Sequence, residues 1–189
     1  MPVSNEDRRV RKTKKQLRSA LTTLLLENDI SHITVRDVAE LADVNRGTFY
    51  AHYSDVYDLL RQLEDDFLAS LDELGARHDA RQSNGETFPY LTDLFRLVGE
   101  YSDIFYSLYC RSGDTGFQEK IFNLLKYQYL YEFLSIYGGS ESVQLDYYAA
   151  YIVSGMCALA KVWIETGLQE TPEEIAAMGG RFVMKGLGN

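Results

Sequence analysis

Proline is scarce in this sequence, and its scarcity narrows the fold class. Three prolines in 189 residues leave long stretches that helices can occupy without interruption. The glycines fall mostly between apolar stretches, a pattern that favours helices over a sandwich of short strands. We therefore predict an all-α protein.

Cysteine and histidine are also scarce, which argues against metal and covalent chemistry. The two cysteines, Cys110 and Cys157, lie in apolar helical contexts and are interpreted as small buried hydrophobes in a reducing compartment. The three histidines, His32, His52 and His78, lack metal-ligand spacing with each other or with a cysteine. The sequence also lacks a nucleophile motif, a phosphate loop and a dinucleotide fingerprint. We predict no cofactor, no metal and no enzyme, with a small-molecule enzyme on a helical scaffold kept as an alternative.

Long hydrophobic runs are missing as well. No apolar run reaches the roughly 18 residues of a membrane span, and the polar, basic N-terminus is not followed by the apolar core of a signal peptide. Hydrophobic residues nevertheless make up 46 % of the chain, enough for a packed core. These features predict a soluble, cytoplasmic protein.

The net charge of −9 argues against nucleic acid, but its distribution reverses that argument. Residues 1–20 hold seven bases against two acids, whereas residues 61–189 hold ten bases against nineteen acids. A short basic arm on an acidic body can contact phosphate while the body is repelled by it.

Apolar spacing and turn residues predict a chain of helices. Thr34 and Asp37 form a start signal for the second helix, Asn45 caps the third, and Thr171-Pro172-Glu173-Glu174 starts the last. A polar stretch at 75–87 is the clearest internal linker. The predicted helices span about 5–27, 34–42, 45–52, 54–74, 88–99, 102–111, 115–137, 141–166 and 171 onward.

The segment from Thr34 to Tyr53 predicts a helix-turn-helix whose second helix is set up to lie in the major groove. Ala39 is small enough for the two helices to approach closely, Asp43 lies where the chain turns with a positive φ, and Phe49 faces inward. The hydroxyls of Thr48, Tyr50 and Tyr53 are expected to meet phosphate oxygens.

These residues resemble the DNA-binding signature of TetR-type regulators, in Val44, Gly47-Thr48-Phe49-Tyr50, His52-Tyr53 and Leu59-Leu60. The resemblance implies an all-α dimer. Its three N-terminal helices would form a DNA-binding domain at 1–55, and 56–189 would form a helical effector-binding and dimerisation domain. Together with the basic arm and the cap of the third helix, the predicted DNA-binding residues are Arg11, Lys12, Lys15, Thr34, Asn45, Arg46, Gly47, Thr48, Tyr50, His52 and Tyr53.

The sequence departs from this family pattern at three positions. Asp43 replaces the usual turn glycine, Ser54 replaces a common basic residue, and Val56 replaces a frequent lysine. Losing two cations should weaken non-specific phosphate binding and flatten its salt dependence, although the basic arm at 8–15 compensates. The family default is a repressor released by a small-molecule effector. The alternative is a protein of this fold with weakened DNA binding that acts as an activator or co-regulator through a protein partner.

Two late helices carry a packing seam at alternating steps of three and four residues. It is read either as intrachain core or as a dimer interface in which the last two helices of each subunit form a four-helix bundle. A dimer would read two half-sites about 34–36 Å apart or a multiple of that distance. The predicted dimer residues are Leu145, Tyr148, Ile152, Gly155, Leu159, Val162, Ile175, Met178 and Phe182.

The stretch 151–176 resembles a TetR subgroup typified by a dihydroxyacetone-kinase regulator, in Gly155, Trp163, Gly167 and Thr171-Pro172-Glu173-Glu174. Some relatives in that subgroup respond to a protein partner.

Tyrosines are dense between residues 90 and 151, and Gln128 interrupts an apolar helix face where a polar group needs a partner. These residues are read either as ordinary core or as a pocket for an aromatic or apolar effector. The predicted pocket residues are Tyr101, Phe105, Tyr109, Gln128, Tyr131 and Trp163.

Overall fold

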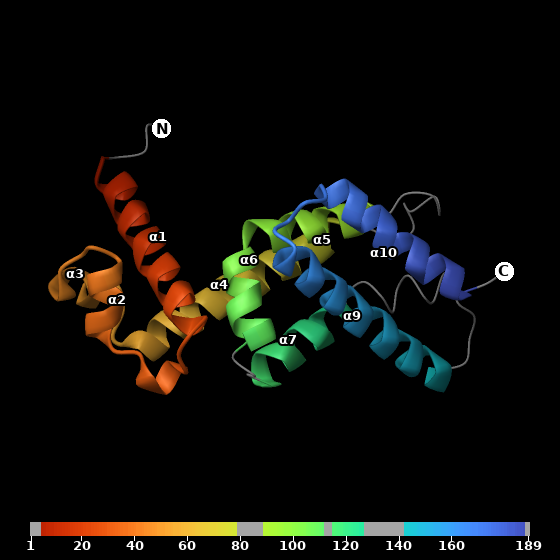
Figure 1. Cartoon of the computed structure of the whole chain (residues 1–189), viewed down its shortest axis with the longest axis horizontal. Coiled ribbons are helices and arrows are strands. Elements are labelled where there is room, and N and C mark those ends of the chain that lie inside the picture. Colours follow the sequence, from red (N-terminus) through yellow and green to blue (C-terminus); the bar gives the residue numbers. More distant parts are fainter. Residues whose placement is uncertain (1–4, 79–88, 112–114, 127–141, 188–189) are drawn as a thin grey trace. The chain divides into compact units, whose positions relative to one another are not determined.

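The computed structural model describes residues 5–78, 89–111, 115–126 and 142–187. Every regular element within these ranges is a helix (Figure 1), which confirms the predicted all-α class. The predicted helix at 115–137 is described only as far as residue 126.

The chain divides into two compact units. The first comprises residues 1–66 and 103–114, and the second comprises residues 67–102 and 115–189. The division falls inside α4, Val56–Arg77, whereas the sequence reasoning placed the domain boundary where that helix begins. The assignment of 1–55 and 56–189 to separate functions stays a prediction.

The first unit contains the predicted helix-turn-helix. Its elements are α1 (Asn5–Leu25), the short η1 (Ile30–His32), α2 (Val35–Leu41), α3 (Arg46–Tyr50), the beginning of α4 and the π-helix η3 (Phe105–Arg111). α1 packs against α2 and η3, and α2 packs against α3. The core of this unit includes Leu17, Leu21, Val38, Phe49, Leu59, Leu63, Phe105 and Leu108.

Helices α2, α3 and α10 begin where the cap residues predicted. Thr34 and Asp37 form a reciprocal capping box at α2, and the Asn45 side chain accepts the Gly47 N–H at α3. At α10 (Pro172–Leu187), the Glu174 carboxylate accepts the Thr171 N–H at 2.8 Å, while the Thr171 hydroxyl accepts the Glu174 N–H at 3.2 Å. These starts were readable from the sequence because each depends on residues three positions apart.

The end of α2 confirms the expected positive φ at Asp43, which is 53°. The Asp43 N–H donates to the Glu40 carbonyl at 3.2 Å, and the Val44 N–H donates to the Ala39 carbonyl at 3.0 Å. This pair of hydrogen bonds is a Schellman motif, a position where glycine is the usual residue. The aspartate therefore holds the tight turn of the helix-turn-helix in a left-handed conformation that most side chains disfavour.

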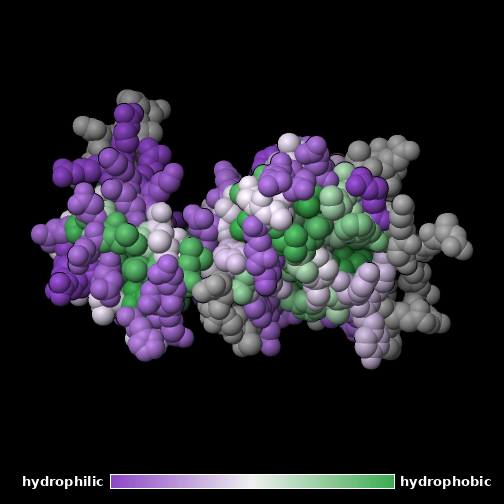
Figure 2. All heavy atoms as spheres, viewed as in Figure 1, coloured by the Kyte–Doolittle hydropathy of each residue, from purple (hydrophilic) through white to green (hydrophobic). Residues whose placement is uncertain are grey.

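The second unit is built from the rest of α4 with α5 (Pro89–Glu100), α7 (Thr115–Leu125), α9 (Ser142–Glu165) and α10. α5 packs against α10 and α9, and α7 packs against α9. The short α6, Ser102–Ile104, precedes η3. Hydrophobic residues reach the surface of this unit over α5, α9 and α10 (Figure 2).

One part of α9, Asp146–Glu165, is long and apolar enough to cross a membrane by length and composition alone, although the sequence reasoning found no such run. In the second unit this segment packs against α5, α7 and α10. It is 39 % buried, so one face packs within the unit while the rest of the segment is exposed.

We expect Asp43→Val to lower the free energy of unfolding by about 1–2 kcal/mol, because a β-branched side chain fits poorly at a positive φ. Asp43→Gly should change it by less than about 1 kcal/mol, since glycine adopts this conformation freely but loses more entropy on folding. Urea denaturation of purified protein measures both. Asp65→Val, at an exposed position within α4, is the matched control and should cost roughly 0.5 kcal/mol. Equal losses for the two valine variants would contradict the role given to Asp43.

Candidate nucleic-acid interface

Phe49 anchors the short helix α3 to the core of the first unit. This side chain is fully buried, and its ring lies 5.7 Å from the rings of both Tyr50 and Tyr53. With Phe49 directed inward, Arg46 and Gly47 are exposed, and Tyr50 is 58 % exposed. Helix α3 therefore presents a solvent-exposed face that can contact a partner.

The three remaining predicted residues lie on α3, at Thr48, or just outside its ends, at Asn45 and His52. Thr48 and His52 are half-buried, and the Asn45 side chain is occupied by the Gly47 N–H at 2.8 Å. Asn45 therefore acts first as the helix cap. A direct contact of these three residues with DNA stays a prediction.

Tyr53 corrects the sequence prediction. It was expected to present its hydroxyl to phosphate, but the side chain is only 2 % exposed and packs against Phe49. Its hydroxyl is buried and has no hydrogen-bond partner in the described part of the chain. The aromatic ring contributes its apolar surface to the core, so a DNA contact by Tyr53 is wrong for this conformation.

At the start of α2, Thr34 is committed to its own cap. Its hydroxyl donates to the Asp37 carboxylate at 2.6 Å, and its N–H donates to the same oxygen at 2.9 Å. These two hydrogen bonds lower the pKa of Asp37, so the carboxylate stays charged at neutral pH. A phosphate contact by Thr34 stays a prediction, and it would form beside a negative charge.

The basic arm lies on the first half of α1. Arg11, Lys12 and Lys15 are exposed, as predicted. The same half of α1 is hydrophilic in Figure 2. These cations can meet phosphate, which binds through charge rather than sequence.

The start of α4 explains the two departures from the family pattern. Val56 is 3 % exposed and belongs to the core, while the Asp58 carboxylate accepts the Ser54 N–H at 2.9 Å. That backbone hydrogen bond, followed by one from Gln62, lowers the pKa of Asp58. The start of α4 therefore carries the ionised Asp58 carboxylate and has no cation at residue 54 or 56.

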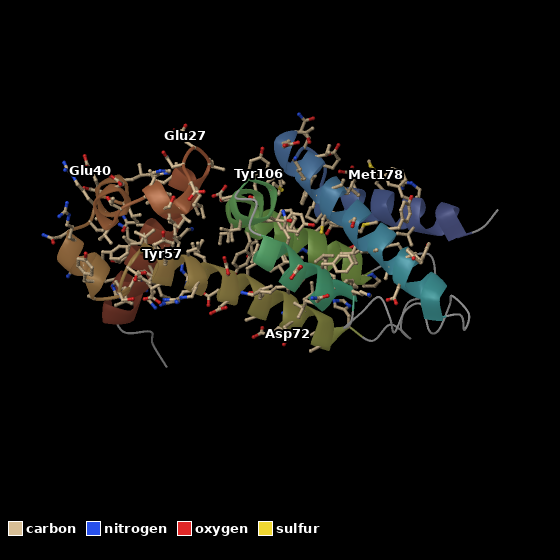
Figure 3. The ribbon with its side chains drawn as sticks, turned by 90° about the horizontal axis from the view of Figure 1, so that it is seen from below. Glu27, Glu40, Tyr57, Asp72, Tyr106 and Met178 are labelled. Carbon is tan, nitrogen blue, oxygen red and sulfur yellow. The ribbon has the colours of Figure 1, made fainter. Side chains whose placement is uncertain are left out.

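Tyr57 is a candidate that the sequence reasoning missed. It follows the buried Val56 and is 52 % exposed (Figure 3). Its position one residue off the buried face formed by Val56, Leu59 and Leu63 was the available signal. The exposed phenol offers a further hydroxyl in the first unit.

Trp163, which was predicted to line the effector pocket, is a core residue whose ring N–H is satisfied, and its part in a pocket stays a prediction. It is 3 % exposed, its ring N–H donates to the Glu170 carbonyl at 3.0 Å, and its ring meets Phe95 edge-on at 5.8 Å. The ring also closes over Gly99, where an added Cβ would lie 3.2 Å from the indole. No free polar group of Trp163 is left for a ligand.

The other pocket residues stay predictions. Gln128 and Tyr131 lie outside the described residues. Tyr101, in the second unit, packs edge-on against Phe67 with its hydroxyl 3.4 Å from that of Ser70. In the first unit, Phe105 is buried and stacks on Tyr109 with ring centroids 4.9 Å apart.

Some residues of the predicted dimer interface are buried within the protomer, and others lie on its surface. Ile152 and Ile175 are buried within the protomer, so neither can contact a partner directly. Tyr148 is half-buried and its hydroxyl donates to the Val183 carbonyl on α10, and Leu159 lies 3.3 Å from the Cβ position of Gly179. Tyr148 and Leu159 therefore contact α10 within one chain, and their part in a dimer interface stays a prediction.

Three of the predicted positions remain available on the outside. Gly155 has open space around its Cβ position, Val162 is 54 % exposed and Phe182 is 58 % exposed. Met178 is half-buried (Figure 3), and the side chain of Leu145 lies outside the described set.

Two exposed tyrosines extend this face and were missed. Tyr147 and Tyr151 are 77 % and 67 % exposed, and they lie on the same side of α9 as Gly155 and Val162. Both faces of α9 are apolar, so helical spacing alone could not tell the intrachain face from the outer one.

Comparison with known proteins gives three kinds of match. The family model TetR_C_8, described as a transcriptional regulator C-terminal region, matches residues 85–185. The uncharacterized HTH-type transcriptional regulator YxbF of Bacillus subtilis is 38 % identical over 56 residues, which are 30 % of this chain and 15 % of that protein. The chain therefore spans only a small part of the curated relative that it matches.

Solved structures of similar proteins match nearly the whole chain. A TetR transcriptional regulator from Streptococcus agalactiae is 27 % identical, with a TM-score of 0.62, over 94 % of this chain and 97 % of that one. The dihydroxyacetone kinase operon activator DhaS is 18 % identical, with a TM-score of 0.57, over 93 % and 96 %. FadR from Bacillus subtilis in complex with stearoyl-CoA is 14 % identical, with a TM-score of 0.63, over 92 % and 99 %. The last two matches show likeness of fold.

The lowered pKa of Asp37 predicts a pH dependence of stability. Because its folded pKa lies below the ordinary value of 3.8, its contribution is present above that value and is lost as pH falls through the folded pKa. The difference in free energy of unfolding between wild type and Asp37→Asn should therefore be largest above about pH 5 and shrink towards about pH 3. Urea denaturation across this range measures it. A difference that stays constant with pH would contradict the charged cap.

Proposed function

Because the chain belongs to the TetR family of transcriptional regulators, we propose that it binds operator DNA as a homodimer, with α3 in the major groove. The observation that carries this proposal is the exposed face of α3 over the buried Phe49. Helix-turn-helix proteins read bases with such a second helix.

Each exposed side chain suits a different part of the duplex. The guanidinium of Arg46, at the first position of α3, can pair with a guanine edge through two hydrogen bonds. The Tyr50 hydroxyl can donate to a phosphate oxygen, and Lys12 and Lys15 on α1 can neutralise phosphates. Arg46 would then give sequence preference, while the basic arm would give affinity.

The outer face of α9 supports the homodimer. Tyr147, Tyr151, Gly155 and Val162 form an apolar stripe opposite the face that packs within the second unit, and Phe182 adds an exposed ring from α10. Large exposed apolar patches mark association sites. A second copy of the chain would cover this stripe with its own α9 and α10.

We propose further that the protein is a cytoplasmic repressor released by an apolar or aromatic small molecule bound in the second unit. Support comes from the family and from the fold shared with FadR, whose structure holds stearoyl-CoA. The fold shared with the activator DhaS favours activation through a protein partner as the second candidate. A reporter carrying the selected operator separates them, since loss of this protein raises expression under repression and lowers it under activation.

We expect Arg46→Ala to weaken operator binding roughly 5- to 150-fold, the effect of losing about 1–3 kcal/mol of base recognition. Binding to random duplex of the same length should fall much less. The operator is first selected from a random or genomic DNA pool, and affinities are then measured by fluorescence anisotropy. Arg77→Ala removes the same charge from an exposed site in the second unit and should leave both affinities unchanged. If selection with wild-type protein enriches no sequence, the specific DNA-binding proposal fails.

We expect Val162→Glu combined with Tyr151→Glu to convert the dimer to a monomer, because two carboxylates on each copy would be buried against an apolar surface. Sedimentation velocity at micromolar concentration measures the change. Ala177→Glu, at an exposed position on α10, should leave the dimer intact. A wild-type protein that sediments as a monomer would overturn the dimer proposal.

A further inference from the structure

Arg18 lies in a polar cluster at the edge of the apolar core of the first unit. It projects from α1, and its guanidinium donates a hydrogen bond to the Asp66 carboxylate on α4. The Arg18 side chain is 27 % exposed, so most of it is enclosed by the unit. An arginine in this position can bind two partners at once, because its planar group carries five N–H donors.

The Tyr53 hydroxyl is a close neighbour of Arg18, although the two side chains form no hydrogen bond. Partial burial lowers the pKa of Arg18, but the Tyr53 hydroxyl and the Asp66 carboxylate together raise it above its ordinary value. The hydroxyl lies beside the guanidinium without completing a hydrogen bond, and Arg18 Nε is also buried and unpaired in the described part of the chain. Buried polar atoms of this kind are uncommon, and here two of them belong to one cluster.

Tyr53 is tightly joined to the recognition helix. Its N–H donates to the Phe49 carbonyl at 3.0 Å, and its ring packs against Phe49 at 5.7 Å. A shift of Tyr53 would therefore move Phe49 and α3 with it. Arg18 for its part lies one helical turn beyond Lys15, on the helix that carries the basic arm.

We propose that Arg18 is a positioning residue for operator binding, because its guanidinium binds Asp66 on α4 and lies against the buried Tyr53 hydroxyl. This holds α3 and the basic arm in one fixed relation. The inference rests on the proposed DNA-binding function. Two sets of contacts strengthen each other only when their spacing matches the ligand, and recognition fails when supporting residues let a site move by a fraction of an ångström.

Two simpler roles for Arg18 make different predictions. If Arg18 supplied only positive charge to phosphate, Arg18→Lys would retain it, and loss of the charge would weaken operator and random DNA alike. If Arg18 only stabilised the fold, its variants would lower the unfolding midpoint without changing the ratio of operator to random affinity. A positioning role requires the planar fork, so neither lysine nor methionine replaces it.

The experiment uses full-length protein, the selected operator and a random duplex of equal length, with affinities measured by anisotropy at several salt concentrations. We expect Arg18→Met and Arg18→Lys each to weaken operator binding about tenfold, equivalent to roughly 1.4 kcal/mol. Binding to random duplex should change less than about twofold. Arg77→Met is the control for loss of a charge. Thermal unfolding of each variant reports whether it is folded.

Tyr53→Phe tests the same cluster by removing a single oxygen, so it keeps the proposal falsifiable if Arg18→Met fails to fold. It should weaken operator binding about threefold, and the double variant should be no weaker than Arg18→Met, because both changes break one unit. Wild-type operator preference in Arg18→Lys, or additive losses in the double variant, would overturn the positioning role alone. Absence of any operator preference in the wild type would overturn the proposed function, and this inference with it.

Discussion

The burial of Phe49 is the contact on which the first unit depends. Helix α3 has five residues, too few to be stable in water by itself, because the first turn of a helix costs more entropy than its hydrogen bonds return. Packing of Phe49 and the Asn45 cap supply the missing stability. Packing in the core therefore fixes which face of α3 is exposed.

In the second unit, α9 performs two tasks with opposite faces. Ile152 and Trp163 face the interior, where Trp163 meets Phe95 and donates to the Glu170 carbonyl. The outer face stays apolar and exposed at Tyr151 and Val162. This outer face is the surface that a second copy would cover in the proposed dimer.

The local features of this protein could be predicted from the sequence. Which side chains are buried and which are exposed could not. The Thr34–Asp37 cap and the positive φ of Asp43 depend on hydrogen bonds and sterics within a few residues. Tyr53 was misassigned because a phenol suits core and surface equally, and only the packing on Phe49 decides between them. The π-helix η3 was predicted simply as helix, because its residues carry no signal that separates five-residue from four-residue hydrogen bonding.

In the second unit, the Trp163 ring fills the space beside Gly99. Since an added Cβ at residue 99 would lie 3.2 Å from the indole ring, any side chain there must take space that the ring now fills. The sizes of these two residues are thus coupled across sixty-four positions of sequence. Related sequences that carry a larger residue at position 99 should carry a smaller one at position 163, so their covariation would record this contact.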